Sequence, residues 1–180
     1  MNKEKLAVVL AAGIILLIIA YASADNTRAF FCPNDRCQQV ITDKINAAKE
    51  TIDIAMYYLT NREIIQGLVK AKERGVVIRV FLDRGHENIK NYPKSDYLLK
   101  SGIEVRSGGD TELMHNKFAV IDNKILITGS FDWAATTINW DRQNLLIIPD
   151  KDLIKRHADR FELLWKQGIK SESGIEEKEE

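Results

Sequence analysis

A chain of 180 residues has room for one domain and for little besides a short leader and a short tail. Hydrophobic residues make up 45% and charged residues 29% of the chain, which is ordinary globular usage, so a real core can be buried. Lys plus Arg equals Asp plus Glu at 26 each, and this balance excludes a global positive field that would attract polyanions.

The N-terminus is the clearest break in composition. Lys3 and Lys5 precede an uncharged apolar run over residues 6–21, and an Ala-x-Ala sequence ends at Ala24. This pattern is typical of a secretory signal peptide cleaved before Asp25, and equally of an uncleaved membrane anchor. We therefore expect a protein that is secreted, extracytoplasmic or held at a membrane through residues 6–21.

The domain organisation follows from this break and from the glutamate-rich C-terminus. We expect a signal peptide or anchor over residues 1–24, one folded domain over residues 25–168, and an acidic disordered tail over residues 169–180. Without the tail the folded part is mildly basic, which suits a phosphate-binding protein.

The two cysteines, Cys32 and Cys37, lie close together in the sequence. In an exported domain they would close a short disulfide loop, and a pair of free buried thiols is the alternative. Two ligands alone do not make a zinc site, and no histidine lies near them in sequence. We therefore expect no metal at this position.

Strand-like and helix-like segments alternate after the leader. Helices are predicted over residues 38–50, 92–100 and about 150–167, and between the cap residue Asn61 and the stop signal Gly75. Strands are predicted over residues 27–31, 51–59, 76–82, 103–106, 115–121, 124–128 and 143–148. Asp122 and Asn123 would join two of these strands in a tight hairpin. The pattern predicts an α/β fold, with a mixed β-sheet sandwiched between helices.

The informative stretch is HNKFAVIDNKILITGSFDW, residues 115–133. Because side chains alternate along a strand, His115 and Lys117 project to the same face. A histidine that exchanges protons near neutral pH, next to a fixed ammonium, suits a phosphate centre. Gly129 and Ser130 end the returning strand beside His115, where small residues leave space for a ligand and the hydroxyl can donate a hydrogen bond.

Asp122 has the opposite parity on this strand. By a rise of ~3.3 Å per residue it lies more than ~20 Å from His115 along an extended chain. Its position alone therefore favours a role in stabilising the turn.

The complete spacing is more specific than any single pair. His115-x-Lys117, four residues, Asp122, six residues and Gly129-Ser130 match the HKD signature of the phospholipase D superfamily without a gap. The chain resembles in particular the small single-motif bacterial endonucleases of that superfamily and the related mitochondrial proteins. The resemblance covers the pattern from about residue 30 to 165, including Gln143-Asn144 at the start of a strand.

This resemblance implies a two-step phosphodiester displacement that needs no metal and no cofactor. One histidine attacks phosphorus and a second protonates the leaving oxygen, while lysines hold the nonbridging oxygens. His115, Lys117 and Asp122 are the candidate catalytic residues of the motif. Because this chain carries one copy and the mechanism needs two, the resemblance implies a homodimer whose motifs meet on a two-fold axis.

The candidate substrate-binding residues include two departures from the family pattern. Ser130 and Asn144 match it, whereas Asp132 stands where the family usually has Asn, and Gln143 where it usually has Glu. The exchange preserves the total charge of the pair. We hypothesise that the two positions adjoin and that Asp132 supplies the carboxylate that orients a histidine, the alternative being a weakened or inactive enzyme.

The same chemistry serves DNA, RNA and phospholipid, and the small single-motif chain favours a nuclease. Scattered basic residues would line an approach path for a nucleic-acid backbone or would simply be solvated: Arg79, Arg84, Arg106, Lys124 and Arg142. Phe131, Trp133 and Trp140 would stack on unpaired bases or, as we favour for each, belong to the core. The alternatives are a phospholipid-cleaving hydrolase and a dimeric module that binds nucleic acid without turnover.

Overall fold

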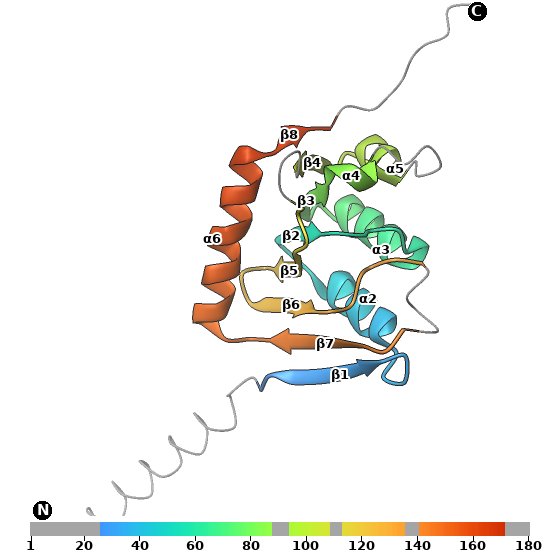
Figure 1. Cartoon of the computed structure of the whole chain (residues 1–180), viewed down its shortest axis with the longest axis vertical. Helices are drawn as coiled ribbons and strands as arrows, with labels where there is room; N and C mark the ends of the chain where they lie inside the picture. Colours follow the sequence, from blue (N-terminus) through green and yellow to red (C-terminus); the bar gives the residue numbers. More distant parts are fainter. Residues whose placement is uncertain (1–25, 88–93, 109–112, 136–140, 172–180) are drawn as a thin grey trace, which may run out of the picture.

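The computed structural model describes residues 26–87, 94–108, 113–135 and 141–171, and the fold is built from these ranges (Figure 1). They form one eight-stranded sheet in the order β1-β7-β6-β5-β2-β3-β4-β8. β2 pairs with β3, and β3 with β4, in parallel, while the remaining neighbours are antiparallel. The predicted mixed sheet is therefore confirmed.

The strands are short and follow the predicted order. Their bounds are β1 (Arg28–Cys32), β2 (Thr51–Met56), β3 (Val77–Asp83), β4 (Glu104–Gly108), β5 (Lys117–Ile121), β6 (Ile125–Gly129), β7 (Gln143–Ile148) and β8 (Ile169–Lys170). β8 pairs with β4 and lies in the segment that we assigned to the acidic tail, so the folded domain continues two residues beyond 168. Residues 172–180 lie outside the described ranges.

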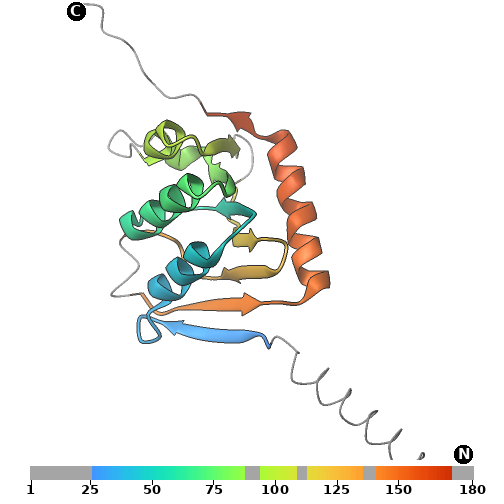
Figure 2. The same ribbon diagram turned by 180° about the vertical axis from the view of Figure 1, so that it is seen from behind.

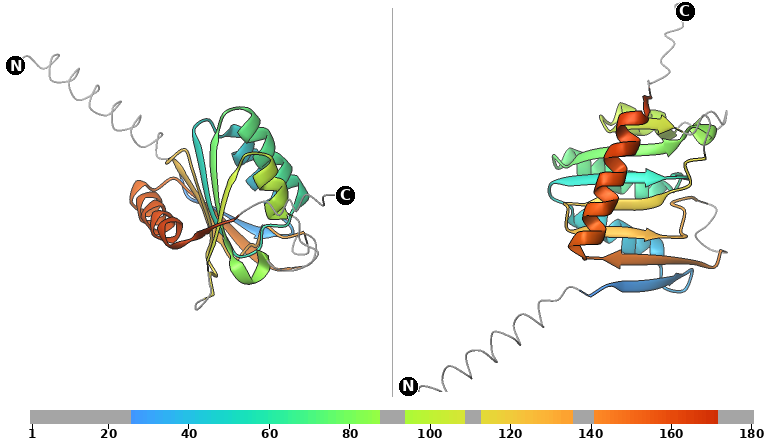
Figure 3. Two further views of the ribbon diagram at one scale, coloured as in Figure 1. Left: turned by 90° about the horizontal axis from the view of Figure 1, so that it is seen from above. Right: turned by 60° about the vertical axis from the view of Figure 1, so that its left-hand side comes forward.

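Helices cover both faces of the sheet. The helices α2 (Cys37–Ala47), α3 (Arg62–Glu73) and α5 (Lys94–Lys100) lie on one face, and α6 (Lys151–Gln167) crosses the other (Figures 2 and 3). Each face has its own hydrophobic core. The core on one face receives side chains from the first three helices, among them Ile41, Ile64 and Leu98. The core on the other face receives Phe161 and Trp165 from α6. The helices thus sandwich the sheet, as the sequence predicts.

Differences from the predicted elements are local. β2 ends at Met56 instead of residue 59, because Leu59 forms a bridge with Trp133 and the amides of Thr60 and Asn61 donate to the Trp133 carbonyl. The short helix α4 (Arg84–Glu87) was not predicted, because four residues carry no periodic signal.

Cys32 and Cys37 form a disulfide that closes the turn between β1 and α2.

Asp122 does more than stabilise its own turn. The predicted hairpin is present, with positive φ angles at Asp122 and Asn123. The Asp122 carboxylate also accepts hydrogen bonds from the amides of Lys49, Glu50 and Thr51, at 2.7 to 3.2 Å. Burial alone would raise the pKa of Asp122, but these amides and the nearby Lys124 ammonium hold it below its usual value. The carboxylate therefore ties the β5–β6 turn to the connection between α2 and β2.

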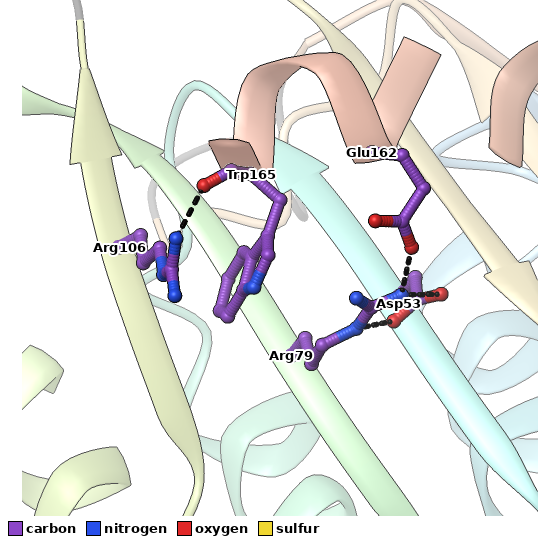
Figure 4. Close-up of polar contacts among 5 residues, drawn as sticks. All are labelled: Asp53, Arg79, Arg106, Glu162 and Trp165. Atoms are coloured by element: carbon purple, nitrogen blue, oxygen red, sulfur yellow. Dashed lines mark hydrogen bonds and ion pairs between the residues drawn. The ribbon is translucent and has the colours of Figure 1, made fainter. Parts of the chain in front are cut away.

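Two arginines of the sheet bind residues of α6 through hydrogen bonds and ring contacts (Figure 4). Arg79 donates to both carboxylate oxygens of Asp53, at 2.7 and 2.8 Å, and to Glu162 at 2.7 Å. Its guanidinium also lies over the rings of Phe161 and Trp165. Arg106 stacks on Trp165 and donates to its carbonyl oxygen at 2.6 Å. Neither arginine is therefore free to line a path for nucleic acid.

We expect Arg79→Ala to lower the free energy of unfolding by about 2–3 kcal/mol, because it strands the Asp53 carboxylate and removes packing against α6. Glu162→Ala is the matched control. The Glu162 side chain is 47% exposed, so its loss should cost less than about 1 kcal/mol. Urea unfolding followed by circular dichroism measures both, and equal effects would contradict the assignment.

Asp122→Ala should lower stability by about 2 kcal/mol at pH 7, because three backbone amides lose a charged acceptor. Since the folded pKa lies below the unfolded one, this stabilisation is present above about pH 4 and is lost as the pH falls through the folded value. The difference from wild type should therefore shrink between pH 7 and pH 3 in urea unfolding. Asp159→Ala, which removes only an exposed pair with Lys155, should show little effect at either pH.

Candidate active site

His115 and Lys117 lie together where β5 begins, as their strand parity predicts. The Nζ atom of Lys117 lies 3.3 Å from Nε2 of His115. The His115 side chain is exposed, whereas the Lys117 side chain is only 10% exposed. The site is therefore a fixed ammonium beside an imidazole that a substrate can reach.

The contact restricts how a neutral imidazole can be arranged. A charged ammonium can only donate, so in this contact Nε2 of His115 accepts and a neutral ring carries its proton on Nδ1. The Nε2 lone pair then points at the Lys117 ammonium, so an attack by Nε2 on an electrophile requires this contact to open.

Lys117 is held by an ion pair and by an aromatic ring. Oδ1 of Asp132 lies 2.9 Å from the ammonium, and the Asp132 side chain is only 16% exposed. The ammonium also lies 4.7 Å from the centre of the Tyr57 ring. An incoming phosphate oxygen would therefore compete with Asp132 for this cation.

Tyr57 was not among the residues predicted from the sequence. Its ring packs edge-to-face on His115, with the centroids 4.4 Å apart, as well as against the Lys117 ammonium. Burial, followed by electrostatic interactions with Tyr58, Asp83 and Asp132, raises the pKa of Tyr57 above its ordinary value. The one sequence signal was a pair of tyrosines just after the apolar run of β2.

Asp83 is a second residue that sequence reasoning missed. This carboxylate is only 2% exposed and ends β3. Its oxygens accept from the amides of Gly85 and Met114, at 3.0 and 2.9 Å. Because Met114 directly precedes His115, Asp83 fixes the backbone from which the imidazole projects.

Ser130 and Asn144 close the loop between β6 and β7. The amides of Ser130 and Phe131 donate to the Asn144 carbonyl, and the Asn144 amide donates to Oγ of Ser130 at 3.0 Å. Gly129 has a φ of +145°, and a Cβ there would collide with the Asn144 carbonyl oxygen. Glycine is therefore required for this close approach.

The positions of the two departures adjoin, as we hypothesised. Oε1 of Gln143 accepts from the Asp132 amide at 3.1 Å. Asp132 forms an ion pair with Lys117, and its role in orienting a histidine stays a prediction. The exchange of amide and carboxylate thus places a negative charge beside the lysine of the motif.

Several other candidates lie away from this site. Asp122 lies at the opposite end of β5, where it binds the backbone of residues 49–51. Lys124 pairs with Glu50 at that end. His157 lies on α6, where its ring packs edge-to-face on Phe118.

Two of the three aromatic residues of the loop after the motif belong to the core, as we favoured for each. Phe131 and Trp133 are buried, and Trp140 lies outside the described residues.

The described ranges contain no group of three or more His, Cys, Asp or Glu side chains placed to bind a metal ion. Within the same ranges, no helix has the length and apolar character needed to cross a membrane. The apolar run over residues 6–21 lies outside them.

Comparison of the sequence with known families and proteins gives a consistent result. The family model described as "Cardiolipin synthase, PLD-like domain" matches residues 41–165. The human mitochondrial cardiolipin hydrolase is 32% identical over 121 residues, which are 67% of this chain and 48% of the human protein. Phospholipase D of Rickettsia bellii is 32% identical over 147 residues, covering 82% of this chain and 71% of that protein. The chain spans about half the length of the mammalian hydrolases, 47% to 54%.

Solved structures show the same fold. Nuc from Salmonella typhimurium, a phospholipase D family member, superposes with a TM-score of 0.77 at 25% identity, over 82% of this chain and 99% of Nuc. NucT from Helicobacter pylori gives a TM-score of 0.74 at 21% identity, over 81% and 99% of the two chains. The family model matches residues 41–165, which are most of this chain, and the histidine and lysine of the motif lie together where β5 begins. The chain therefore belongs to the phospholipase D-like family.

Proposed function

We propose that this protein is a metal-independent phosphodiesterase that acts as a homodimer, and that its substrate is a nucleic acid. The observation that carries the proposal is the exposed His115 imidazole whose Nε2 lies 3.3 Å from a fixed Lys117 ammonium. A nucleophile beside a permanent cation matches the needs of displacement at a phosphodiester.

The reaction would proceed in two displacements at phosphorus. Nε2 of His115 forms a bond to phosphorus as the bond to the leaving oxygen breaks, and His115 of the partner subunit gives that oxygen a proton. The same partner histidine then takes a proton from water, and the resulting hydroxide displaces His115 from the phosphohistidine. Lys117 of each subunit neutralises the nonbridging oxygens through both transition states.

The dimer follows from the single copy of the motif. Each chain supplies one histidine, whereas the two displacements need a nucleophile and a separate acid. Leu113, two residues before His115, is 63% exposed and offers an apolar contact beside the site. An isologous contact through the surface around the start of β5 would bring the His115–Lys117 pairs of two subunits together.

Nucleic acid is favoured as the substrate because the site lies open on the surface with polar neighbours. His115 and Ser130 are exposed, and so is Arg142 just before β7. Phospholipid is the second candidate. The exposed Leu113 supports it, as do the relatives named cardiolipin hydrolase and phospholipase D.

We also propose that the enzyme works outside the cytoplasm or at a membrane surface. The apolar run over residues 6–21 and the Ala-x-Ala sequence before Asp25 support this location. The Cys32–Cys37 disulfide supports it independently, because such bonds persist in oxidising compartments.

The full chain, purified in a mild detergent, should cleave DNA in excess EDTA, because no step draws on a metal ion. His115→Ala should lower the rate more than about a thousandfold by removing the nucleophile and the acid together. Gel assays on single-stranded and duplex DNA measure both, with His157→Gln as a histidine control expected to retain activity. Specific activity should also fall on dilution, as the dimer dissociates.

Three outcomes would contradict parts of this proposal. A requirement for Mg²⁺, or full activity in His115→Ala, would exclude the phosphohistidine route. Cleavage of anionic phospholipid vesicles but of neither DNA nor RNA would show that the substrate is a phospholipid instead of a nucleic acid. Salt-sensitive binding of DNA without cleavage of any diester would identify a binding module that has lost turnover.

A charge-exchange series tests the pair of departures. Asp132→Asn leaves Lys117 without its anion, and Gln143→Glu alone sets a second carboxylate beside Asp132. We expect each single variant to lower kcat about tenfold or more, and the double variant to recover most of the loss because it restores one carboxylate. Full activity in Asp132→Asn would refute the exchange hypothesis, and additive losses in the double variant would show that the two positions act independently.

A further inference from the structure

Hydrolysis of a phosphodiester changes the charge of the group that the site holds. The substrate and the phosphohistidine each carry two nonbridging oxygens that share one negative charge. The product is a monoester with a third such oxygen and, above about pH 6, a second negative charge. A site that attracts the second charge would hold its product more tightly than its substrate, so the charges around Lys117 decide how easily the product leaves.

The Asp132 carboxylate is fixed close to where that second charge would form. Its Oδ1 atom lies 2.9 Å from the Lys117 ammonium, and both side chains are only slightly exposed. The Asp132 amide donates to Oε1 of Gln143 at 3.1 Å, which holds the backbone at this position. A phosphate oxygen that binds another N–H donor of the same ammonium would therefore lie about 5 Å from the carboxylate.

A second carboxylate adds to the negative potential at this end of β5. The Asp83 side chain is buried, and it accepts from the backbone amide just before His115. Burial raises the pKa of Tyr57, whose ring packs on the imidazole, and electrostatic interactions with nearby groups, Asp83 and Asp132 among them, raise it further. The Lys117 ammonium is thus accompanied by two carboxylates.

We propose that Asp132 makes the site select the singly charged diester over the doubly charged monoester that the reaction releases. The carboxylate offsets the charge of the ammonium, so the second charge of a monoester meets repulsion. The inference rests on the proposed phosphodiesterase reaction. It applies to a nucleic acid and to a phospholipid alike, because hydrolysis of either gives a monoester.

The size of the effect follows from Coulomb's law. With an effective dielectric constant of about 20, two unit charges about 5 Å apart change a dissociation constant by about two-hundredfold. Because the site is open, screening by solvent reduces this to about tenfold. The Asn that the family usually has at this position carries no charge, so it would discriminate less between the two ligands.

Binding is measured at about pH 8 with the full chain in a mild detergent, by ³¹P NMR titration of methyl phosphate, a dianion, and dimethyl phosphate, a monoanion. Wild type should bind methyl phosphate about tenfold more weakly than dimethyl phosphate. Asp132→Asn should remove or invert this ratio, whereas Asp132→Glu keeps the charge and should preserve it. Asp159→Asn removes a carboxylate from the exposed surface of α6 and is the matched control, expected to keep the wild-type ratio.

Turnover gives a second readout. Hydrolysis of bis(p-nitrophenyl) phosphate releases p-nitrophenyl phosphate, which is the dianion. The competitive Ki of this added product should be about tenfold lower for Asp132→Asn than for wild type, because the lysine is then free to bind it. A purely structural role of Asp132 would instead lower kcat in the Asn and Glu variants alike and leave the ratio of product Ki to substrate KM unchanged.

The outcomes separate the inference from the proposed function. Wild type that binds methyl phosphate as tightly as dimethyl phosphate would overturn the inference while leaving the phosphodiesterase intact, and this result needs no variant to fold. An unchanged ratio in Asp132→Asn would overturn it too, as would an equal loss of the ratio in Asp159→Asn, which would indicate an effect of net charge. Wild type that hydrolyses no diester would overturn the function, and the titration would still decide the inference.

Discussion

The antiparallel pairing of β5 with β2 is the constraint on which the site depends. Its register sets Met56 opposite Lys117, so Tyr57 leaves β2 at the place where His115 enters β5. β6 and β7 continue the antiparallel pattern, so Ser130 and Gln143 reach the same edge of the sheet. The contacts among these residues, which lie far apart in the sequence, thus follow from the successive antiparallel pairing of β2, β5, β6 and β7. A one-residue slip would turn Lys117 into the opposite core.

The Asp122 carboxylate anchors the strand that carries Lys117, although it lies at the opposite end of that strand from the candidate site. The residues between Lys117 and Asp122 are the rest of β5. At one end of this strand the ammonium meets Asp132, and at the other the carboxylate binds the amides of residues 49–51. Those amides begin β2, so Asp122 holds β2 and β5 in register from the end opposite the site. In this view the third residue of the motif positions the first two.

The sequence predicted what strand parity and local turn chemistry determine. His115 and Lys117 share a face because they are two residues apart, and the hairpin follows from Asp122-Asn123. Tyr57 and Asp83 were not predicted, because their contacts with His115, Lys117 and Met114 depend on which strands are neighbours in the sheet. The adjacency of Asp132 and Gln143 was anticipated from charge conservation, but the partner of the carboxylate was not. That partner is decided by side-chain packing at the strand ends, which periodicity does not encode.

The position of the carboxylate changes what the site offers to a phosphate. In the proposed dimer, each subunit would contribute one cation and one anion at the reacting centre, because Lys117 is paired with Asp132. The motif alone would then supply little net positive charge, and a phosphodiester entering between two such pairs would have to draw both ammonium groups away from their carboxylates. Affinity for a polyanion would therefore have to come from charges outside the motif. Arg79 and Arg106 are engaged with α6, so they do not supply it.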